Sequence, residues 1–324
     1  MIFLLFLIYV ILFNIEVCST DRFDIFERQS RTWKYYPFDV AMKVNSVKDV
    51  PKLLRVTEQL IEIPGKDLYE FFRNLYEKNK PSATLWREEP KIPKIIHQIW
   101  IGSPVPQELK EFLATWPAIH PDWEYKLWTD ADLFDFHLEN QDLFDIAENY
   151  GVKSDIWRYE ILYRHGGVYV DTDFESIENL EFLNHLYDFY TGLQTLDSEL
   201  IQLGLALIGA RAGHPMLKMC IQELRESFSR PGVVQKAGPM HFTRVFYKYA
   251  NSFPELIDIA FPAFYFYPLG CREHVSDHAQ AIKVWRSVGV FAVHWWSKTW
   301  LPAKHRRKEF STILNEHAVI AWDR

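Results

Sequence analysis

The stretch that decides the fold is SDIWRYEILYRHGGVYVDTD, which runs from Ser154 to Asp173. Ser154 is a favourable N-cap residue, and Asp155 then falls in the first helical turn, where a negative charge suits the helix dipole. Gly166-Gly167 supplies the glycine that commonly ends a helix. The stretch therefore predicts a helix, a glycine stop, a strand and a pair of carboxylates.

The spacing within this stretch places its polar residues on defined faces. Asp155 and Arg158 are three residues apart and share one face of the helix. Alternation along the strand places Tyr169, Asp171 and Asp173 on one side. Two carboxylates there repel unless a cation or hydrogen-bond donors lie between them, and such oxygen ligands suit Mg²⁺ or Mn²⁺ held together with substrate phosphates. A capped turn with solvated acids is the alternative interpretation.

A second Asp-X-Asp, Asp130-Ala131-Asp132, follows Thr129 at the expected start of another helix. Acidic residues are favoured at that position for capping alone. We therefore expect a structural role for this second copy.

The flanking regions alternate between strands and helices. An apolar block from Ile95 to Ile101 that ends at Gly102 predicts a buried strand and its turn. The segments that follow predict a helix, a strand and a helix over Pro106–Trp116, Trp123–Trp128 and Asp130–Leu138. This alternation predicts an α/β fold with a wound, mostly parallel sheet flanked by helices.

The two ends differ from the middle of the chain. Met1 to Phe13 is an apolar run of signal-peptide length, short for a membrane span, so residues 1–19 are expected to be a signal peptide or a membrane anchor, with a buried helix as the alternative. Residues 20–90 are expected to form a helical stem, with a helical stretch from Val47 to Tyr76 interrupted at Pro51 and Pro64. The main domain is expected over residues 91–303, and a basic tail, mainly solvated, over 304–324.

The composition is that of a globular protein. The 324 residues are 48% hydrophobic, with a formal net charge of −7 and a pI near 6.0. This acidic balance argues against nucleic-acid binding, which requires a basic face. The aromatic content of 16% indicates a bulky core, with platforms for sugars as the alternative. Pairing of Cys220 with Cys271 is left open.

Three motifs together resemble a known family, the glycosyltransferases with a DXD sugar-binding region. They are the segments IPKIIHQIWIG at 92–102, HPDWEY at 120–125 and the stretch from Asp155 to Asp173. The likeness covers about residues 92–300 and is strongest to fungal initiating and inositol-phosphoceramide mannosyltransferases, and more distant to the catalytic domains of clostridial glucosylating toxins. It implies a GT-A type fold, a nucleotide-sugar donor and Mn²⁺ or Mg²⁺ as cofactor.

The resemblance also implies a catalytic set. Asp155 and Arg158 are similar to the pair that grips the sugar and ribose hydroxyls and the diphosphate of the donor. Asp171 is similar to the acid that holds the ribose and, often through water, the metal, and Asp173 to the direct metal ligand. A helix-surface ion pair is the alternative for Asp155 and Arg158.

Four further residues receive roles from the same resemblance. Trp100 is similar to the tryptophan that stacks on the donor base, and Tyr169 to a residue lining the donor pocket. His294 is expected to complete the metal shell, and Lys298 to meet the diphosphate. The alternatives are core packing for the first three and an exposed loop for Lys298.

The implied activity is a metal-dependent, retaining transfer of a sugar, with mannose favoured, to a glycan, glycolipid or protein acceptor. The family is usually assigned a front-face displacement, and a double displacement is left open. Relatives often carry an Asn where this chain has Gln202-Leu203, which leaves the sugar and acceptor open. A catalytically silent carbohydrate-binding protein and a metal-dependent phosphohydrolase are the alternatives. The amino-terminal segment fits a membrane-associated enzyme on the luminal side of the Golgi, or a secreted one if it is cleaved.

Overall fold

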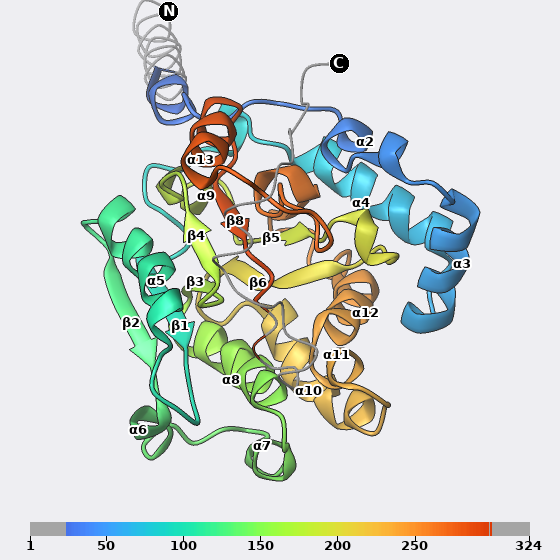
Figure 1. The fold of residues 1–324 in the computed structure, drawn as a ribbon, viewed down its shortest axis with the longest axis vertical. Coiled ribbons are helices and arrows are strands. Elements are labelled where there is room, and N and C mark those ends of the chain that lie inside the picture. The colour runs from blue at the N-terminus through green and yellow to red at the C-terminus, as the bar shows by residue number, and fades with distance from the viewer. Residues whose placement is uncertain (1–23, 298, 300–324) are drawn as a thin grey trace, which may run out of the picture.

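The computed structural model describes residues 24–297 and residue 299 (Figure 1). The leader expected at residues 1–19, the basic tail expected at 304–324 and Lys298 all lie outside these residues. Within the described ranges, no helix combines the length and the apolar character needed to cross a bilayer.

A six-stranded sheet forms the centre of the molecule, in the order β2-β1-β3-β6-β5-β7. β1 pairs in parallel with β2 and β3, and β5 pairs in parallel with β7. β6 is antiparallel to both of its neighbours. The predicted mostly parallel α/β sheet is therefore confirmed. The six strands are β1 (Ile95–Ile99), β2 (Glu124–Trp128), β3 (Gly167–Val170), β5 (Phe189–Leu193), β6 (Leu203–Ala210) and β7 (Asp258–Phe261).

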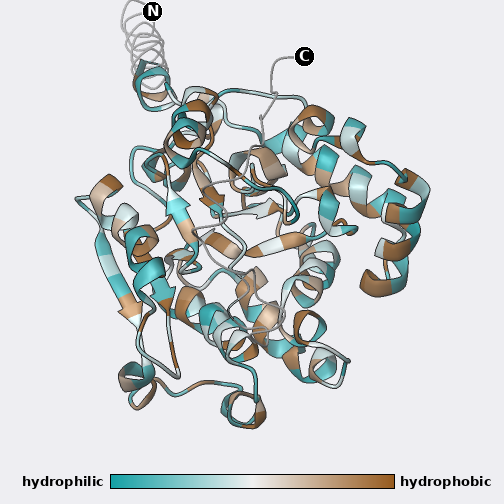
Figure 2. Ribbon diagram, viewed as in Figure 1, coloured by the Kyte–Doolittle hydropathy of each residue, from teal (hydrophilic) through white to brown (hydrophobic). Residues whose placement is uncertain are grey.

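Helices flank this sheet (Figure 1). α8 and α12 pack against β6, α5 packs against β2, and α4 packs against β7. Figure 2 shows polar and apolar residues alternating along these outer helices, as expected where one helix face meets the core and the other meets water. The helices are α2 (Phe38–Ala41), α3 (Val50–Ile61), α4 (Gly65–Asn79), α5 (Gln107–Ile119), α6 (Asp130–Leu133), α7 (Gln141–Ile146), α8 (Tyr150–His165), α9 (Glu181–Asn184), α10 (Pro215–Phe228), α11 (Val233–Lys236), α12 (Pro239–Tyr249) and α13 (His278–Ser287), with 3-10 turns at Val44–Ser46, Ala83–Leu85, Leu196–Ser198 and Ala263–Tyr265.

The helical lead-in is joined to the body by polar contacts. The Tyr76 hydroxyl lies 2.9 Å from that of Tyr265, and Asn79 Nδ2 donates to the Asp258 carbonyl over 2.8 Å. α3 and α4 account for the helical stretch expected from Val47 to Tyr76. Pro51 is the second residue of α3 and does not interrupt it, because proline is tolerated in the first helical turn.

The start of α8 differs from the prediction. The helix begins at Tyr150, and its N-cap is Asn149, whose side chain accepts hydrogen bonds from the amides of Gly151 and Val152. Ser154 is consequently inside the helix, and Asp155 is in the second turn, beyond the strongest part of the helix dipole. The predicted glycine stop is confirmed, since Gly166 follows the helix with φ of 64°.

A second, two-stranded sheet lies beside the first and carries part of the site. β4 (Phe174–Ser176) pairs antiparallel with β8 (Ala292–His294), and Phe174 lies opposite His294. We call this pair the β4–β8 ribbon. It brings together segments that are about 120 residues apart in sequence.

Candidate active site

The two acids of the Asp-X-Asp follow the end of β3. The strand stops at Val170, the Asp171 amide donates to the Ala206 carbonyl over 2.8 Å, and the Phe174 amide donates to the Asp171 carbonyl over 3.1 Å. Asp173 therefore lies in a turn and not on the same strand face as Tyr169 and Asp171, which corrects the sequence prediction. The strand alternation ends because the chain leaves β3 to enter the β4–β8 ribbon.

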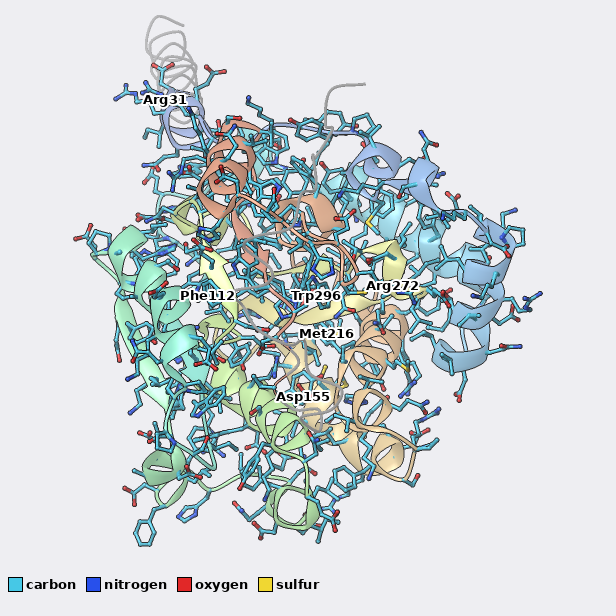
Figure 3. The ribbon with its side chains drawn as sticks, viewed as in Figure 1. Arg31, Phe112, Asp155, Met216, Arg272 and Trp296 are labelled. Carbon is cyan, nitrogen blue, oxygen red and sulfur yellow. The ribbon has the colours of Figure 1, made fainter. Side chains whose placement is uncertain are left out.

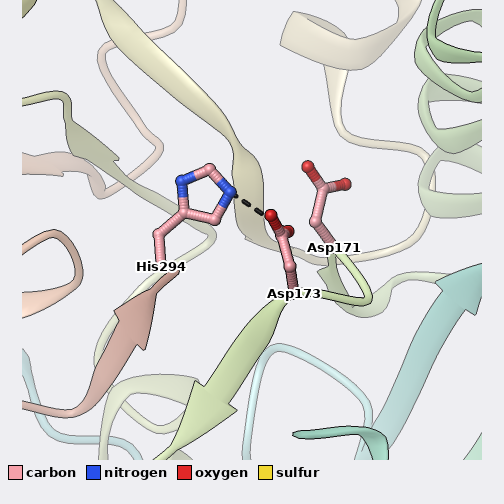
Figure 4. Close-up of side chains that lie close together, drawn as sticks. All are labelled: Asp171, Asp173 and His294. Carbon is pink, nitrogen blue, oxygen red and sulfur yellow. Dashed lines mark hydrogen bonds and ion pairs between the residues drawn. The ribbon is translucent and has the colours of Figure 1, made fainter. Parts of the chain in front are cut away.

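This turn and the ribbon bring three candidate metal ligands together. Asp171, Asp173 and His294 each offer a ligand atom, and these atoms all lie within 4.8 Å of one another. Figure 4 shows His294 reaching toward Asp173 from the end of β8, with Asp171 on the other side of Asp173. The three residues that the sequence analysis assigned to the metal are thus adjacent in space.

Asp173 is buried and is surrounded by donors. His294 Nε2 lies 3.1 Å from its Oδ1, and the amide and hydroxyl of Ser297 each donate to its Oδ2 over 2.7 Å. Burial alone would raise the pKa of Asp173, but His294 and Ser297 together lower that pKa to about 2. Asp173 is therefore ionised at any physiological pH.

Arg158 links the helix α8 to the Asp-X-Asp. Its guanidinium lies 2.9 Å from Asp155 Oδ1 and 3.1 Å from Asp171 Oδ1, and it stacks over the Tyr169 ring at 4.4 Å. The Tyr169 hydroxyl also donates to Asp171 Oδ1 over 2.8 Å. Among the described residues, the hydrogen bonds and ion pairs of the Asp171 side chain all involve Oδ1. Its Oδ2 is therefore available to a ligand.

The Asp155 carboxyl is buried, and its pKa differs strongly from that of a solvent-exposed aspartate. Burial, together with the charge of Asp171, raises its pKa to about 7 despite the attraction of Arg158. Burial also works against the charged form of Arg158, but Asp171, Tyr169 and Asp155 hold its pKa above the ordinary value. A buried carboxylate with a strongly raised pKa beside other charged groups is a feature of functional sites.

Strand β6 supplies a main-chain acceptor to the site from a segment where its pairing with β5 is irregular. Its register with β5 shifts between Thr191 and Leu193, so that residues 204–207 have no register partner in β5. The Leu205 carbonyl of this segment accepts a 2.7 Å hydrogen bond from Arg158 Nη1. Gly204 is required here because a Cβ would lie 1.9 Å from the Tyr267 hydroxyl. Bulges of this kind often re-aim groups next to active sites.

The first strand contributes Gln98 and Trp100 at the same edge of the sheet. Gln98 Nε2 donates to the Asp171 carbonyl over 3.2 Å, and its Oε1 accepts from the Tyr125 hydroxyl over 2.7 Å. Trp100 follows the carboxyl end of β1, and its indole donates to the Ser103 hydroxyl over 3.3 Å. No described contact joins Trp100 to the acids of the site within residues 24–297, so its role in base stacking stays a prediction.

The second Asp-X-Asp has the structural role predicted for it. Asp132 Oδ2 accepts hydrogen bonds from the amide and hydroxyl of Thr129, which caps α6. Asp130 accepts from the Gly102 amide over 2.9 Å. The helix α6 is shorter than expected and ends at Leu133 instead of Leu138.

Two residues make site contacts that were not predicted from the sequence. Ser297 contacts Asp173 with both its amide and its hydroxyl, and Gln98 orients the Asp171 main chain. Gln98 carried a usable signal, because it is a polar residue inside an apolar buried strand. Figure 3 labels Trp296, the residue that precedes Ser297, and Asp155 toward the middle of the view.

The donor set fits a divalent cation. Carboxylate oxygens suit Mg²⁺ and Mn²⁺, and neutral imidazole is a common metal ligand. His294 Nδ1 is buried and has no hydrogen-bond partner among the described residues. In open α/β sheets, ligands bind beyond the carboxyl ends of the strands, where Asp171 and Trp100 lie. The fold and the candidate ligand set are therefore compatible with an enzyme that holds a phosphorylated substrate through a divalent cation.

Comparison with known proteins shows which enzymes this chain resembles. Residues 106–191 match the family described as "Glycosyltransferase sugar-binding region containing DXD motif". The chain is 30% identical over 186 residues to inositol phosphoceramide mannosyltransferase 2 of Schizosaccharomyces pombe, covering 55% of this chain and 51% of that protein. It is 42% identical over 86 residues to mannosyl phosphorylinositol ceramide synthase SUR1 of Saccharomyces cerevisiae, covering 25% of this chain and 22% of that protein. The resemblance expected from sequence is confirmed: residues 106–191 match the DXD sugar-binding region of glycosyltransferases, and the chain is similar in sequence to named mannosyltransferases.

The similarity is partial in extent. The chain spans about half the length of the first of these relatives. Among solved structures, the PaToxG glycosyltransferase is similar with a TM-score of 0.45 and 19% identity, covering 64% of this chain and 83% of that one.

Proposed function

We propose that this protein is a metal-dependent, retaining glycosyltransferase that transfers mannose from a nucleotide-sugar donor to a glycolipid. The observation that carries the proposal is the convergence of Asp171, Asp173 and His294, with Arg158 bound to the first of them. The mannose and the lipid acceptor are taken from the names of the relatives, which are inositol phosphoceramide mannosyltransferases.

Asp171, Asp173 and His294 would hold the cation, Mn²⁺ or Mg²⁺. Once bound, such a cation supplies neutralisation of the charge that develops on the departing nucleoside diphosphate. Asp173 is kept ionised by Ser297 and His294, so it is ready to bind without first losing a proton. Tyr169 and Gln98 fix the side chain and main chain of Asp171.

Asp155 and Arg158 would contact the donor from the face of α8. Asp155 offers carboxylate oxygens that can accept from sugar hydroxyls, and Arg158 keeps this acid and Asp171 at a fixed spacing. Trp100 would stack on the base of the donor, and Lys298 would meet its diphosphate. Retention then follows from a front-face displacement, in which the leaving phosphate oxygen takes the acceptor proton and no protein base is needed.

The amino-terminal segment suggests where this reaction takes place. We propose that residues 1–19 direct the chain to the secretory pathway and hold it at the membrane, with residues 91–303 as the catalytic domain on its luminal side. The support is the apolar run from Met1 to Phe13. Protease protection of the full chain in sealed microsomes tests this orientation.

The test of function is turnover of a donor panel by the full chain. GDP-mannose, UDP-glucose and UDP-galactose are each supplied with Mn²⁺ or with a chelator, with and without inositol phosphoceramide. We expect metal-dependent turnover of GDP-mannose that Asp173→Ala abolishes. Asp132→Ala is the matched control, because it removes the second acid of the other Asp-X-Asp and should leave metal dependence unchanged. Donor binding that is unaffected by chelator and by Asp173→Ala, without any turnover, would instead support a catalytically silent carbohydrate-binding protein.

A further inference from the structure

A buried carboxylate lies two residues beyond Asp173 and outside the proposed ligand set. Glu175 is the central residue of β4, and its side chain is only 10% exposed. Its Oε2 accepts a 2.7 Å hydrogen bond from His278 Nε2 and a 3.0 Å hydrogen bond from the Trp295 indole. Burying a carboxylate costs free energy unless its oxygens are hydrogen-bonded. We therefore asked what the buried Glu175 carboxylate contributes to the protein.

The three residues belong to three separate elements. Glu175 lies on β4, His278 begins α13, and Trp295 directly follows His294 at the end of β8. One carboxylate oxygen therefore ties a helix and the segment after β8 to the strand that follows Asp173.

Trp295 transmits this restraint to the site. Its amide donates to the Asp173 carbonyl over 3.0 Å, so its main chain bridges the two candidate ligands, His294 and Asp173. Its ring packs against Phe112 on one side, at 5.8 Å and nearly parallel, and against His278 at 5.1 Å. Phe112 belongs to α5 and is labelled in Figure 3.

The β4–β8 ribbon needs such support. It has only three residue pairs, and an isolated two-stranded sheet is marginally stable in water. Backbone pairing alone is therefore a weak device for holding His294 against the Asp171–Asp173 pair. The hydrogen bonds of Glu175 to His278 and Trp295 fix the residue that follows His294, and so make the end of β8 more rigid.

We propose that Glu175 is a positioning residue of the metal site: together with His278 it holds Trp295, and thereby keeps His294 within coordinating distance of Asp171 and Asp173. This inference rests on the proposed metal site. It assigns Glu175 and His278 to the support of the ligands and not to contact with the cation. Residues that orient metal ligands typically change metal affinity or activity by about 10- to 100-fold when they are replaced.

The test is direct Mn²⁺ binding by calorimetry on the full chain, together with the Mn²⁺ dependence of donor turnover. We expect Glu175→Ala to raise the Mn²⁺ dissociation constant by about 10- to 100-fold, and kcat at saturating Mn²⁺ to change far less. Glu175→Gln should show a smaller rise, because its amide oxygen still accepts from the Trp295 indole. Unfolding midpoints measured without metal verify that each variant is folded.

The matched control is Glu178→Gln. Glu178 is also partly buried and pairs with α13, through Arg286 at 3.2 Å, but it has no described contact with Trp295 among residues 24–297. Its variant should bind Mn²⁺ as the unaltered chain does. Unchanged Mn²⁺ affinity in folded Glu175→Ala, with affinity lost in Asp173→Ala, would overturn the positioning role and leave the metal site intact. Equal Mn²⁺ binding by the unaltered chain and Asp173→Ala would instead overturn the metal site and the positioning role with it.

Discussion

Replacing Asp155 by Asn should make this protein more stable while impairing its activity. The carboxyl is buried next to Arg158 and Asp171, and burial raises its pKa to about 7 against an ordinary value of 3.8. Asn has nearly the same shape and mimics the protonated form, so Asp155→Asn removes the cost of keeping a charge at this place.

The magnitude follows from the two pKa values. They differ by about 3 pH units, and each unit corresponds to about 1.4 kcal/mol, so the ionised carboxyl costs as much as about 4 kcal/mol of folding free energy at pH 8. The unfolded chain releases this proton near pH 4 and the folded chain near pH 7. Between these values the folded state binds more protons, and the contribution of Asp155 to stability falls as the pH rises. The gain in Asp155→Asn should therefore be near zero at pH 4 and largest above pH 7.

The assay is urea unfolding followed by circular dichroism, in chelator, at pH 5, 6, 7 and 8. Asp142→Asn is the control with the opposite sign, because Arg225 lowers the pKa of that exposed carboxyl and its loss should cost a little stability. Donor turnover by Asp155→Asn should fall, since the amide replaces an acceptor proposed to contact the sugar. An Asp155→Asn variant that is less stable than the unaltered chain at pH 8, or a difference that does not change with pH, would refute this account of the site.

Three further outcomes are expected. His294→Ala should weaken Mn²⁺ binding at least about tenfold in calorimetry, because it removes one of three convergent ligands, and undiminished binding would remove His294 from the set. Gly167→Ala should lower the free energy of unfolding by roughly 1–3 kcal/mol or more, since φ is +96° and a Cβ would lie 2.6 Å from the Ile95 carbonyl oxygen; Gly213→Ala, with φ of +68° and open space, should lose less in the same urea titration. The hydrogen bond to Glu175 raises the pKa of His278 above its ordinary 6.5. The free energy of unfolding lost in His278→Gln should therefore be largest below pH 6.5 and should shrink as the pH rises through the raised pKa. A loss independent of pH between 6 and 9 would contradict that pairing.

Local signals were reliable where a residue acts on its immediate neighbours. The glycine stop after His165 and the capping role of Asp132 depend on contacts within about four residues, and both were predicted. The buried strand from Ile95 was predicted from its local run of apolar residues. The N-cap of α8 was misassigned because Asn149 and Ser154 carry equivalent capping signals. Asn149 is the cap because its side chain binds two free amides, and Gly151 is accommodated in the first turn.

Other features of the site depend on pairings that no local pattern encodes. Asp173 was expected on the face of β3, but β4 pairs with β8 and draws it into a turn where Ser297, 124 residues away, satisfies its carboxylate. The Leu205 carbonyl that accepts from Arg158 lies in the segment of β6 where the register with β5 shifts.

The sequence by itself determined the α/β class, the helix, stop and strand that lead to Asp171, and the resemblance that pointed to His294 as a ligand. The tertiary structure alone decided that His294 lies beside Asp171 and Asp173, that Asp155 is buried enough to hold its proton near neutral pH, and that Glu175 supports the ribbon through His278 and Trp295. The physical reason is that helix caps and strand alternation follow from short-range sterics and hydrogen bonds. Burial, strand pairing across more than a hundred residues and the resulting electrostatics exist only once the chain has packed.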